Sequence, residues 1–236
     1  MKRLILVHGD KGGTGKTHVA QITAACFQAA GHPVKLIDCD RMNPGLHRHF
    51  NDNPDPVAQI NTRKPEGFDD MIGAFLDAPG DVLIDLPAAG SDTTSGFLAE
   101  GTAAGTVDLE SLLTEFGGRL VILFVIDQGR EALVALDAEY KRLPASVTDW
   151  LIVRNHRTDA PFGRFEKAVE KFGFGKEVVL DMPELDRRVV EALVDAKTHI
   201  GKIDTVPGAS SIMKMRAKAA LRLWTAELKK GGLLNV

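Results

Sequence analysis

A glycine-rich segment near the N-terminus constrains the fold more than any other feature of the sequence. Residues 9–17 read GDKGGTGKT, follow the apolar run Leu4–Val7 and open a helical pattern. In this setting, glycines allow backbone N–H groups to turn toward phosphate oxygens, and the helix N-terminus adds further donors. The segment therefore predicts a phosphate-binding loop between a first strand and a first helix.

Two side chains at the end of this loop have expected roles. We expect Lys16 to reach the β- and γ-phosphates of a nucleotide and the Thr17 hydroxyl to bind Mg²⁺. The common pattern G-x-x-x-x-G-K-[ST] has glycine where this chain has Asp10. The segment therefore departs from the common pattern at one position.

The heptamer Lys11–Thr17, KGGTGKT, resembles the deviant Walker A box, K-G-G-x-G-K-[ST], of the ParA/MinD family of P-loop ATPases. The resemblance implies an ATP and Mg²⁺ site whose phosphates are bound by Gly12, Gly13, Thr14, Gly15, Lys16, Thr17 and His18. It also implies that Lys11 reaches across a homodimer interface to the nucleotide of the other subunit, much as an arginine finger does. His18 stands where relatives often have a small hydroxyl residue, so it either lies near phosphate or packs in the core.

Six apolar runs alternate with helical patterns along the chain. The runs are 4–7, 34–37, 82–84, 120–126, 150–153 and 178–180, and the helical patterns are 17–30, 67–78, 108–116, 130–143, 164–172, 184–196 and 210–230. Continuous apolar runs are typical of strands that are covered on both faces. The alternation predicts an α/β fold, a doubly wound, mostly parallel sheet with helices on both faces, in one domain over 1–236.

Two stretches interrupt the alternation. Residues 51–65 are polar and contain three prolines, which predicts an exposed loop. Residues 88–106 are rich in Gly, Ala, Ser and Thr and follow a strand end, where ligands bind in open α/β sheets. The second stretch is either a segment that orders on a ligand or a surface loop.

A pair of carboxylates ends the second apolar run. Alternation along a strand places Asp38 and Asp40 on the same side. Two close carboxylates repel unless a cation or water lies between them, and Mg²⁺ is the expected cation beside a phosphate loop. The resemblance implies that Asp40 positions or activates the attacking water and that Asp38 supports the metal. Arg41 and Met42 follow where many relatives have Pro and Gln, and two solvated loop acids are the alternative.

Two later segments resemble further family motifs. Residues 81–87, DVLIDLP, resemble the Walker B strand, so Asp85 is expected to hold Mg²⁺ through a water; capping the next helix is the alternative. Asn155 follows a late strand at the place where the family binds adenine, and an amide suits an adenine edge. Pro183 lies in the loop that passes the adenine in relatives. A plain turn residue is the alternative for Asn155.

Composition excludes several classes of protein. Hydrophobic residues make up 44% of the chain and charged residues 26%, which excludes a disordered or fibrous chain, and a net charge of −3 excludes a polybasic nucleic-acid coat. The cysteines Cys26 and Cys39 form no C-x-x-C pair, which favours a reduced, cytoplasmic setting and no iron–sulfur role. His47 and His49 have no third partner at zinc-site spacing. No apolar run is long enough to span a membrane.

The last helical pattern is basic. Over residues 210–236 six lysines and arginines accompany one glutamate, and Lys214, Lys218, Arg222 and Lys229 share one quadrant of a helix. We expect Ile212, Met215, Ala219, Leu223 and Ala226 to pack on the domain. The basic stripe is either a sequence-independent DNA-backbone surface or a solvated face. Residues 231–236 are too short and broken for a membrane anchor.

The resemblance implies a dimerising Mg·ATP-dependent switch that hydrolyses ATP slowly in plasmid partition or conjugative transfer, with an adaptor protein as partner. Residues 112–118 and their surroundings resemble TraL/StbB-like plasmid proteins. An alternative from the same P-loop class is a small-molecule ligase or kinase such as dethiobiotin synthetase, with substrate at residues 88–106. A nucleotide-binding scaffold without ATPase activity is disfavoured by the presence of Lys11, Lys16, Asp40 and Asp85.

Overall fold

The computed structural model describes residues 1–9, 12–64, 66–88, 109–156, 159–172 and 178–235. Seven strands form one sheet in the order β3-β2-β4-β1-β5-β6-β7, and every pairing is parallel. The strands are β1 (Lys2–His8), β2 (Val34–Asp38), β3 (Ala58–Gln59), β4 (Asp81–Asp85), β5 (Gly118–Ile126), β6 (Thr148–Asn155) and β7 (Val178–Met182).

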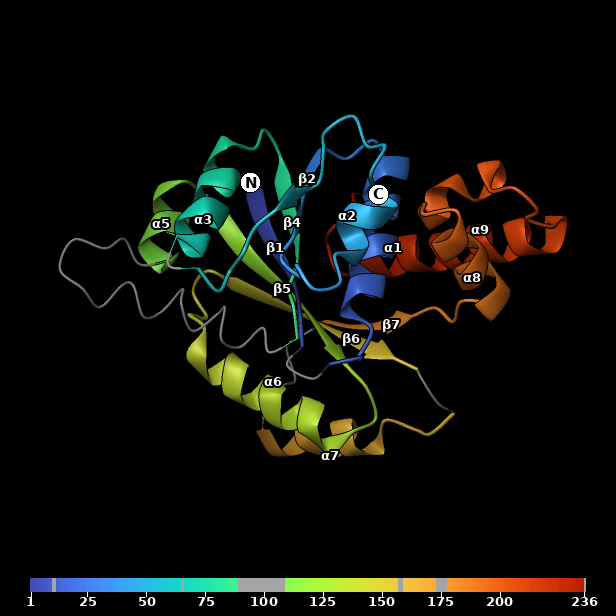
Figure 1. The fold of residues 1–236 in the computed structure, drawn as a ribbon. Helices are drawn as coiled ribbons and strands as arrows, with labels where there is room; N and C mark the ends of the chain where they lie inside the picture. Colours follow the sequence, from blue (N-terminus) through green and yellow to red (C-terminus); the bar gives the residue numbers. More distant parts are fainter. Residues whose placement is uncertain (10–11, 65, 89–108, 157–158, 173–177, 236) are drawn as a thin grey trace.

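Helices cover both faces of this sheet (Figure 1). One face carries α1 (Lys16–Ala29), α2 (Gly45–His49), α8 (Arg187–Asp195), the short 3₁₀ helix η2 (Ile200–Thr205) and α9 (Ser211–Lys230). The other carries α3 (Gly67–Asp77), α5 (Leu109–Glu115), α6 (Arg130–Arg142) and α7 (Gly163–Phe172). The expected doubly wound α/β architecture is confirmed.

The two helical layers exist because alternate residues of each buried strand enter different cores. In β1, Ile5 and Val7 belong to the core under α1 and α9, whereas Leu4 and Leu6 belong to the core under α3 and α5. All four side chains are fully buried. A continuously apolar strand is therefore what two covered faces require.

The expectation of an exposed loop over residues 51–65 is wrong in part. The segment contains β3, which pairs with β2 at Ile37–Ala58 and Asp38–Gln59. Val57 and Ile60 on either side of β3 are buried. An edge strand of two residues is too short to produce a hydrophobic pattern, because only its flanking residues enter the core.

One helix boundary also differs from expectation for a local reason. The helix expected over 184–196 begins at Arg187, because the Asp186 side chain accepts a hydrogen bond from the Arg188 N–H and caps it. The short elements α2 and η2 were not expected. Within the described residues, no helix has the length and apolar character needed to cross a membrane.

The packing face expected for α9 is wrong. Its buried residues are Ala217, Ala220, Trp224 and Leu228. The Trp224 indole N–H donates to Thr23 Oγ1 of α1 at 2.9 Å, which anchors the two helices. Ile212, Met215 and Leu223 instead remain 54%, 62% and 61% exposed. The aromatic anchor therefore fixes the rotation of α9, and a second apolar stripe faces outward.

Candidate nucleotide-binding site

The strand order brings the separate sequence motifs to one edge of the sheet. Strand β4 lies between β1 and β2, so the carboxyl ends of these three strands are neighbours. The glycine-rich loop follows β1, Asp40 follows β2 and Leu86 follows β4. A groove of about 420 Å³ opens there. Of the predicted residues, those that line it are Gly12, Gly13, Gly15, Lys16, Thr17, His18 and Asp40; Gln21, Asn43, Arg48, His49, Ala88 and Val194 complete much of its wall.

The loop backbone has the conformation that a phosphate-binding loop needs. Gly13 and Gly15 have φ of 76° and 96°, in the left-handed region that glycine reaches without strain. Gly15 is the N-cap of α1, and its carbonyl accepts the Val19 N–H at 3.0 Å. The backbone N–H groups of the first turn of α1 therefore lie at the groove end of the helix and have no acceptor within the helix. Lys11 lies outside the described residues.

Asp85 is the most unusual carboxylate of the site. It is fully buried, and within the described residues neither of its carboxylate oxygens makes a hydrogen bond of good geometry. Burial raises the pKa of Asp85 to about 8, with the Asp38 charge adding to the effect, while the nearby Thr17 hydroxyl and Lys16 ammonium oppose it. An unsatisfied buried carboxylate beside a threonine hydroxyl is a donor set that suits Mg²⁺.

The two carboxylates after β2 have different surroundings. Asp38 is buried and accepts the backbone N–H of Asp40 at 3.0 Å and of His47 at 2.9 Å. It therefore ties the first turns of α2 to the end of β2. Burial is the main cause that raises its pKa, partly offset by those backbone hydrogen bonds. Asp40 lines the groove and accepts the N–H groups of Met42 and Asn43, at 3.1 and 3.0 Å.

Asn155 contacts the loop itself. Its Nδ2 donates to the Thr14 carbonyl at 2.7 Å and lies so close to Gly15 that an added Cβ would approach it to 2.4 Å. Asn155 pairs in register with Met182, so Pro183 follows at the same sheet edge. Sequence reasoning placed Asn155 near a base and missed this contact with the loop, because it joins residues 141 positions apart.

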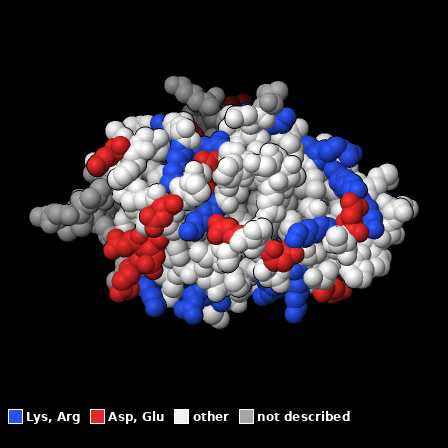
Figure 2. Space-filling view, turned by 90° about the horizontal axis from the view of Figure 1, so that it is seen from above, with Lys and Arg blue, Asp and Glu red and all other residues white. Residues whose placement is uncertain are grey.

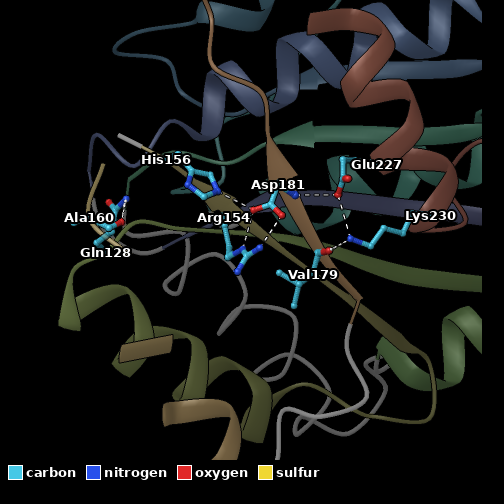
Figure 3. A network of polar contacts seen from close by, with 8 residues as sticks. All are labelled: Gln128, Arg154, His156, Ala160, Val179, Asp181, Glu227 and Lys230. Atoms are coloured by element: carbon cyan, nitrogen blue, oxygen red, sulfur yellow. Dashed lines mark hydrogen bonds and ion pairs between the residues drawn. The ribbon is translucent and has the colours of Figure 1, made fainter. Parts of the chain in front are cut away.

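A network of polar contacts surrounds Asp181 beside Asn155 (Figure 3). The Arg154 guanidinium donates to both Asp181 oxygens, at 2.8 and 2.7 Å, and His156 lies at 2.8 Å. Burial acts to raise the pKa of Asp181, but these hydrogen bonds outweigh it and the pKa is lowered. The Asp181 N–H donates to Glu227 of α9, and Lys230 donates to the Val179 carbonyl. The network links the end of α9 to β7, which Pro183 follows, and to β6, which ends at Asn155.

Histidines form the wall between the groove and a smaller pocket under α8. His18 and His49 line both, and His199 lines the smaller pocket and stacks on Phe50 with ring centroids 4.2 Å apart. Burial and the neighbouring His49 lower the pKa of His18 to about 4, so this side chain is neutral at pH 7. In the described part of the chain, no three His, Cys, Asp or Glu side chains are arranged to hold a metal ion.

The basic stripe on α9 is partly neutralised. Lys218 pairs with the Asp204 carboxylate at 2.7 Å, and Lys214 donates to the Asp204 carbonyl. Arg222 and Lys229 are exposed, and their side chains make no hydrogen bond or ion pair with a described residue. In the view of Figure 2, basic and acidic side chains are interspersed, without one broad basic area. Only part of the predicted stripe is thus available to an external anion.

Solved structures of similar fold cover nearly the whole chain. The MinD septum site-determining protein of Pyrococcus horikoshii OT3, solved with Mg-ADP, has a TM-score of 0.58 at 15% identity and covers 100% of both chains. A putative plasmid partition protein of Borrelia burgdorferi B31, bound to AMPPNP, has a TM-score of 0.52 at 15% identity, covering 98% of this chain and 100% of that one. At these identities the likeness concerns the fold.

Sequence comparison identifies the family. The protein MobD of Acidithiobacillus ferrooxidans is 27% identical over 240 residues, covering 97% of this chain and 96% of that protein. Residues 5–222 match the CbiA family, described as the CobQ/CobB/MinD/ParA nucleotide binding domain. That span includes the glycine-rich loop, Asp38, Asp40, Asp85 and most of α9. The chain belongs to the CobQ/CobB/MinD/ParA family of nucleotide-binding domains.

Proposed function

We propose that this protein is an ATPase switch of the ParA/MinD type, which binds Mg·ATP, dimerises on it and hydrolyses it slowly under the control of a partner. The observation that carries the proposal is the juxtaposition of the KGGTGKT loop with Asp85, whose buried carboxylate lies beside Thr17 without hydrogen bonds of good geometry to described residues. A phosphate loop with a buried carboxylate beside its threonine supplies the groups that bind a nucleotide together with Mg²⁺.

The predicted site residues have distinct roles in this proposal. The backbone N–H groups of residues 12–18 bind the phosphates, and Lys16 balances the β- and γ-phosphate charge. Asp40 positions or activates the attacking water from the groove wall. Lys11 supplies positive charge to the nucleotide of the second subunit. Asn155 and Pro183 contact the adenine base in this proposal, the role that the family resemblance implies for them.

The metal site fits Mg²⁺ by its donors. Mg²⁺ bound there would neutralise charge on the β- and γ-phosphates. The Thr17 hydroxyl would hold it directly and Asp85 through a water, as hard oxygen donors do. Asp38 supports this arrangement indirectly. It accepts the backbone N–H groups of Asp40 and His47 and so fixes the segment that follows β2 and carries Asp40.

The biological setting is proposed from the relatives. MobD resembles the chain over almost all of both sequences, and a putative plasmid partition protein shares its fold. We therefore place the switch on plasmid DNA in the cytoplasm, in mobilisation or partition, with an adaptor protein that stimulates hydrolysis. A ligase or kinase of the same P-loop class is the alternative, and the substrate segment expected for it, residues 88–106, lies outside the described residues apart from Ala88.

Light scattering with nucleotide tests the switch. The protein should be monomeric with Mg·ADP and dimeric with Mg·ATP or a non-hydrolysable analogue, because only the γ-phosphate completes the contact of Lys11 across the interface. Lys11→Ala should lower the dimer fraction at a given concentration without changing nucleotide affinity of the monomer. A wild-type chain that binds ATP and stays monomeric at every concentration would exclude the proposed dimer.

The DNA part of the proposal makes a separate prediction about α9. If Arg222 and Lys229 contact phosphates, the double change Arg222→Glu with Lys229→Glu should weaken binding to two unrelated duplexes alike. It should also reduce the slope of log affinity against log salt by roughly 2, since each lost contact removes about 0.9. Mobility shift at several salt concentrations measures both effects.

The matched control for this prediction lies across the sheet. Lys141→Glu with Lys167→Glu makes the same charge change at exposed positions of α6 and α7. This control should leave the salt slope unchanged. If both double variants lose affinity equally, net charge explains the binding and α9 is not a DNA surface.

A further inference from the structure

We propose that the buried pair His8 and Glu139 positions the first peptide of the glycine-rich loop and, through it, Lys16. The inference rests on the proposed nucleotide-binding function, since it concerns the same site. Neither residue lines the groove, and each is an ionisable side chain enclosed in the core, with 0% and 1% exposure.

His8 ends β1 and contacts the loop directly. The Gly9 N–H donates to His8 Nδ1 at 2.6 Å, so Nδ1 acts as the acceptor. A neutral imidazole that accepts at Nδ1 carries its proton on Nε2. That nitrogen lies 3.5 Å from Glu139 Oε2, and the ring stacks on Phe124 of β5 with centroids 5.2 Å apart. The imidazole is thus held on one face by a ring and at its edge by a carboxylate.

Glu139 lies in the helical layer on the other face of the sheet from α1. It lies on α6, and its carboxylate also pairs with Arg142, one turn further along the helix. A buried carboxylate is costly unless charged or hydrogen-bonding groups surround it. The arrangement Arg142–Glu139–His8 therefore links the surface of α6 to the start of the loop through the core under α6.

Gly9 connects the His8–Glu139 pair to Lys16, because its backbone packs against the Lys16 side chain. Its φ is 151°, and an added Cβ would lie 2.9 Å from the Val125 carbonyl, 3.5 Å from Thr14 Oγ1 and 3.6 Å from Lys16 Cδ. The Gly9 backbone is therefore packed between β5 and the stem of Lys16. If its N–H lost its acceptor, the peptide would turn, and these contacts would have to move with it. Displacements of about 1 Å at a reacting group are enough to slow chemistry strongly.

Three substitutions at His8 separate its two polar contacts. His8→Asn keeps an acceptor near the Nδ1 position and loses the reach to Glu139. His8→Gln keeps a donor near the Nε2 position and loses the acceptor for Gly9. His8→Phe keeps the stacking on Phe124 and loses both. Calorimetry measures the affinity for Mg·ATP, single-turnover hydrolysis measures the rate, and thermal melting measures the stability of each variant.

We expect His8→Phe to weaken Mg·ATP binding roughly tenfold, as the loss of one buried hydrogen bond would. His8→Gln should weaken it similarly, whereas His8→Asn should stay within about threefold of the wild type. At Glu139, Glu139→Gln should keep the wild-type affinity and rate, because its amide oxygen still accepts from Nε2, and Glu139→Leu should not. Rescue by the conservative variants is the result that a packing role alone would not produce.

Two comparison variants make the outcome unambiguous. Phe124→Leu disturbs the packing of the imidazole and leaves its polar contacts, so it should lower the melting temperature with little change in ATP affinity. If Phe124→Leu weakens ATP binding as much as His8→Phe, or if His8→Phe binds ATP like the wild type, the positioning role is wrong. A wild type and a Lys16→Ala variant that both fail to bind ATP would instead refute the proposed function itself.

Discussion

Lys16→Ala is expected to weaken Mg·ATP binding by about a hundredfold or more. The Lys16 side chain is only 6% exposed and enters the groove from the first turn of α1, next to the buried Asp85. In the proposed complex the Lys16 ammonium pairs with the β- and γ-phosphates of ATP. Removing one partner of a buried charge pair costs about 3–5 kcal/mol, because the charge that remains, here that of the phosphates, then lacks compensation. Each 1.4 kcal/mol is a factor of ten in affinity, so the loss exceeds two orders of magnitude.

Calorimetry with Mg·ATP and with Mg·ADP measures this effect. A lysine exposed on the opposite layer serves as the control: Lys167→Ala on α7 removes the same charge from the chain and should leave both affinities unchanged. Thermal melting of the two variants checks that they are folded. Equal ATP affinity in wild type and Lys16→Ala would mean that the glycine-rich loop does not bind the phosphates in this protein.

The parts of the fold that were predictable are those specified by local pattern. Each strand except β3 contains one of the predicted apolar runs, and its ends differ from the predicted run by at most two residues at either terminus. The glycine turn before α1, residues 12–15, was predictable because its conformation depends on consecutive residues. The short strand β3 and the helix η2 were not, since elements of two and six residues are held by tertiary contacts and not by their own periodicity.

The face of α9 shows why a helical period does not by itself identify a core. Ile212, Met215 and Leu223 repeat at helical spacing and are exposed, whereas Trp224 is buried with its N–H bonded to Thr23. Both faces carry apolar residues, so pattern alone left the rotation of the helix undetermined. A large aromatic side chain with a polar group that finds a partner decided it.

In the candidate site, strand alternation predicted that Asp38 and Asp40 lie on the same side of β2. The strand ends at Asp38, so the prediction extended the alternation past the end of the strand. Beyond the strand, alternation no longer applies, and the chain turns so that Asp38 binds backbone N–H groups of the next segment. The contact of Asn155 with Thr14 and the pair His8–Glu139 each join distant parts of the chain, so no local sequence motif predicts them.

Asp40→Asn is expected to slow ATP hydrolysis by about a hundredfold or more while ATP binding is retained. A positioned base contributes factors of about 10²–10⁴, and an amide cannot accept the proton of the attacking water. Asparagine still offers an oxygen to the N–H groups of Met42 and Asn43, so the turn after β2 should survive. Because ATP remains intact, the ATP-bound dimer should accumulate.

Asp40→Ala provides the comparison that separates chemistry from structure. It removes the charge and also the acceptor that holds the Met42 and Asn43 N–H groups. Release of phosphate measures hydrolysis, and light scattering after addition of ATP measures the lifetime of the dimer. If Asp40 acts on the water, both variants lose hydrolysis and both prolong the dimer. If only Asp40→Ala loses activity and Asp40→Asn hydrolyses ATP like the wild type, Asp40 holds the turn, and another residue must activate the water.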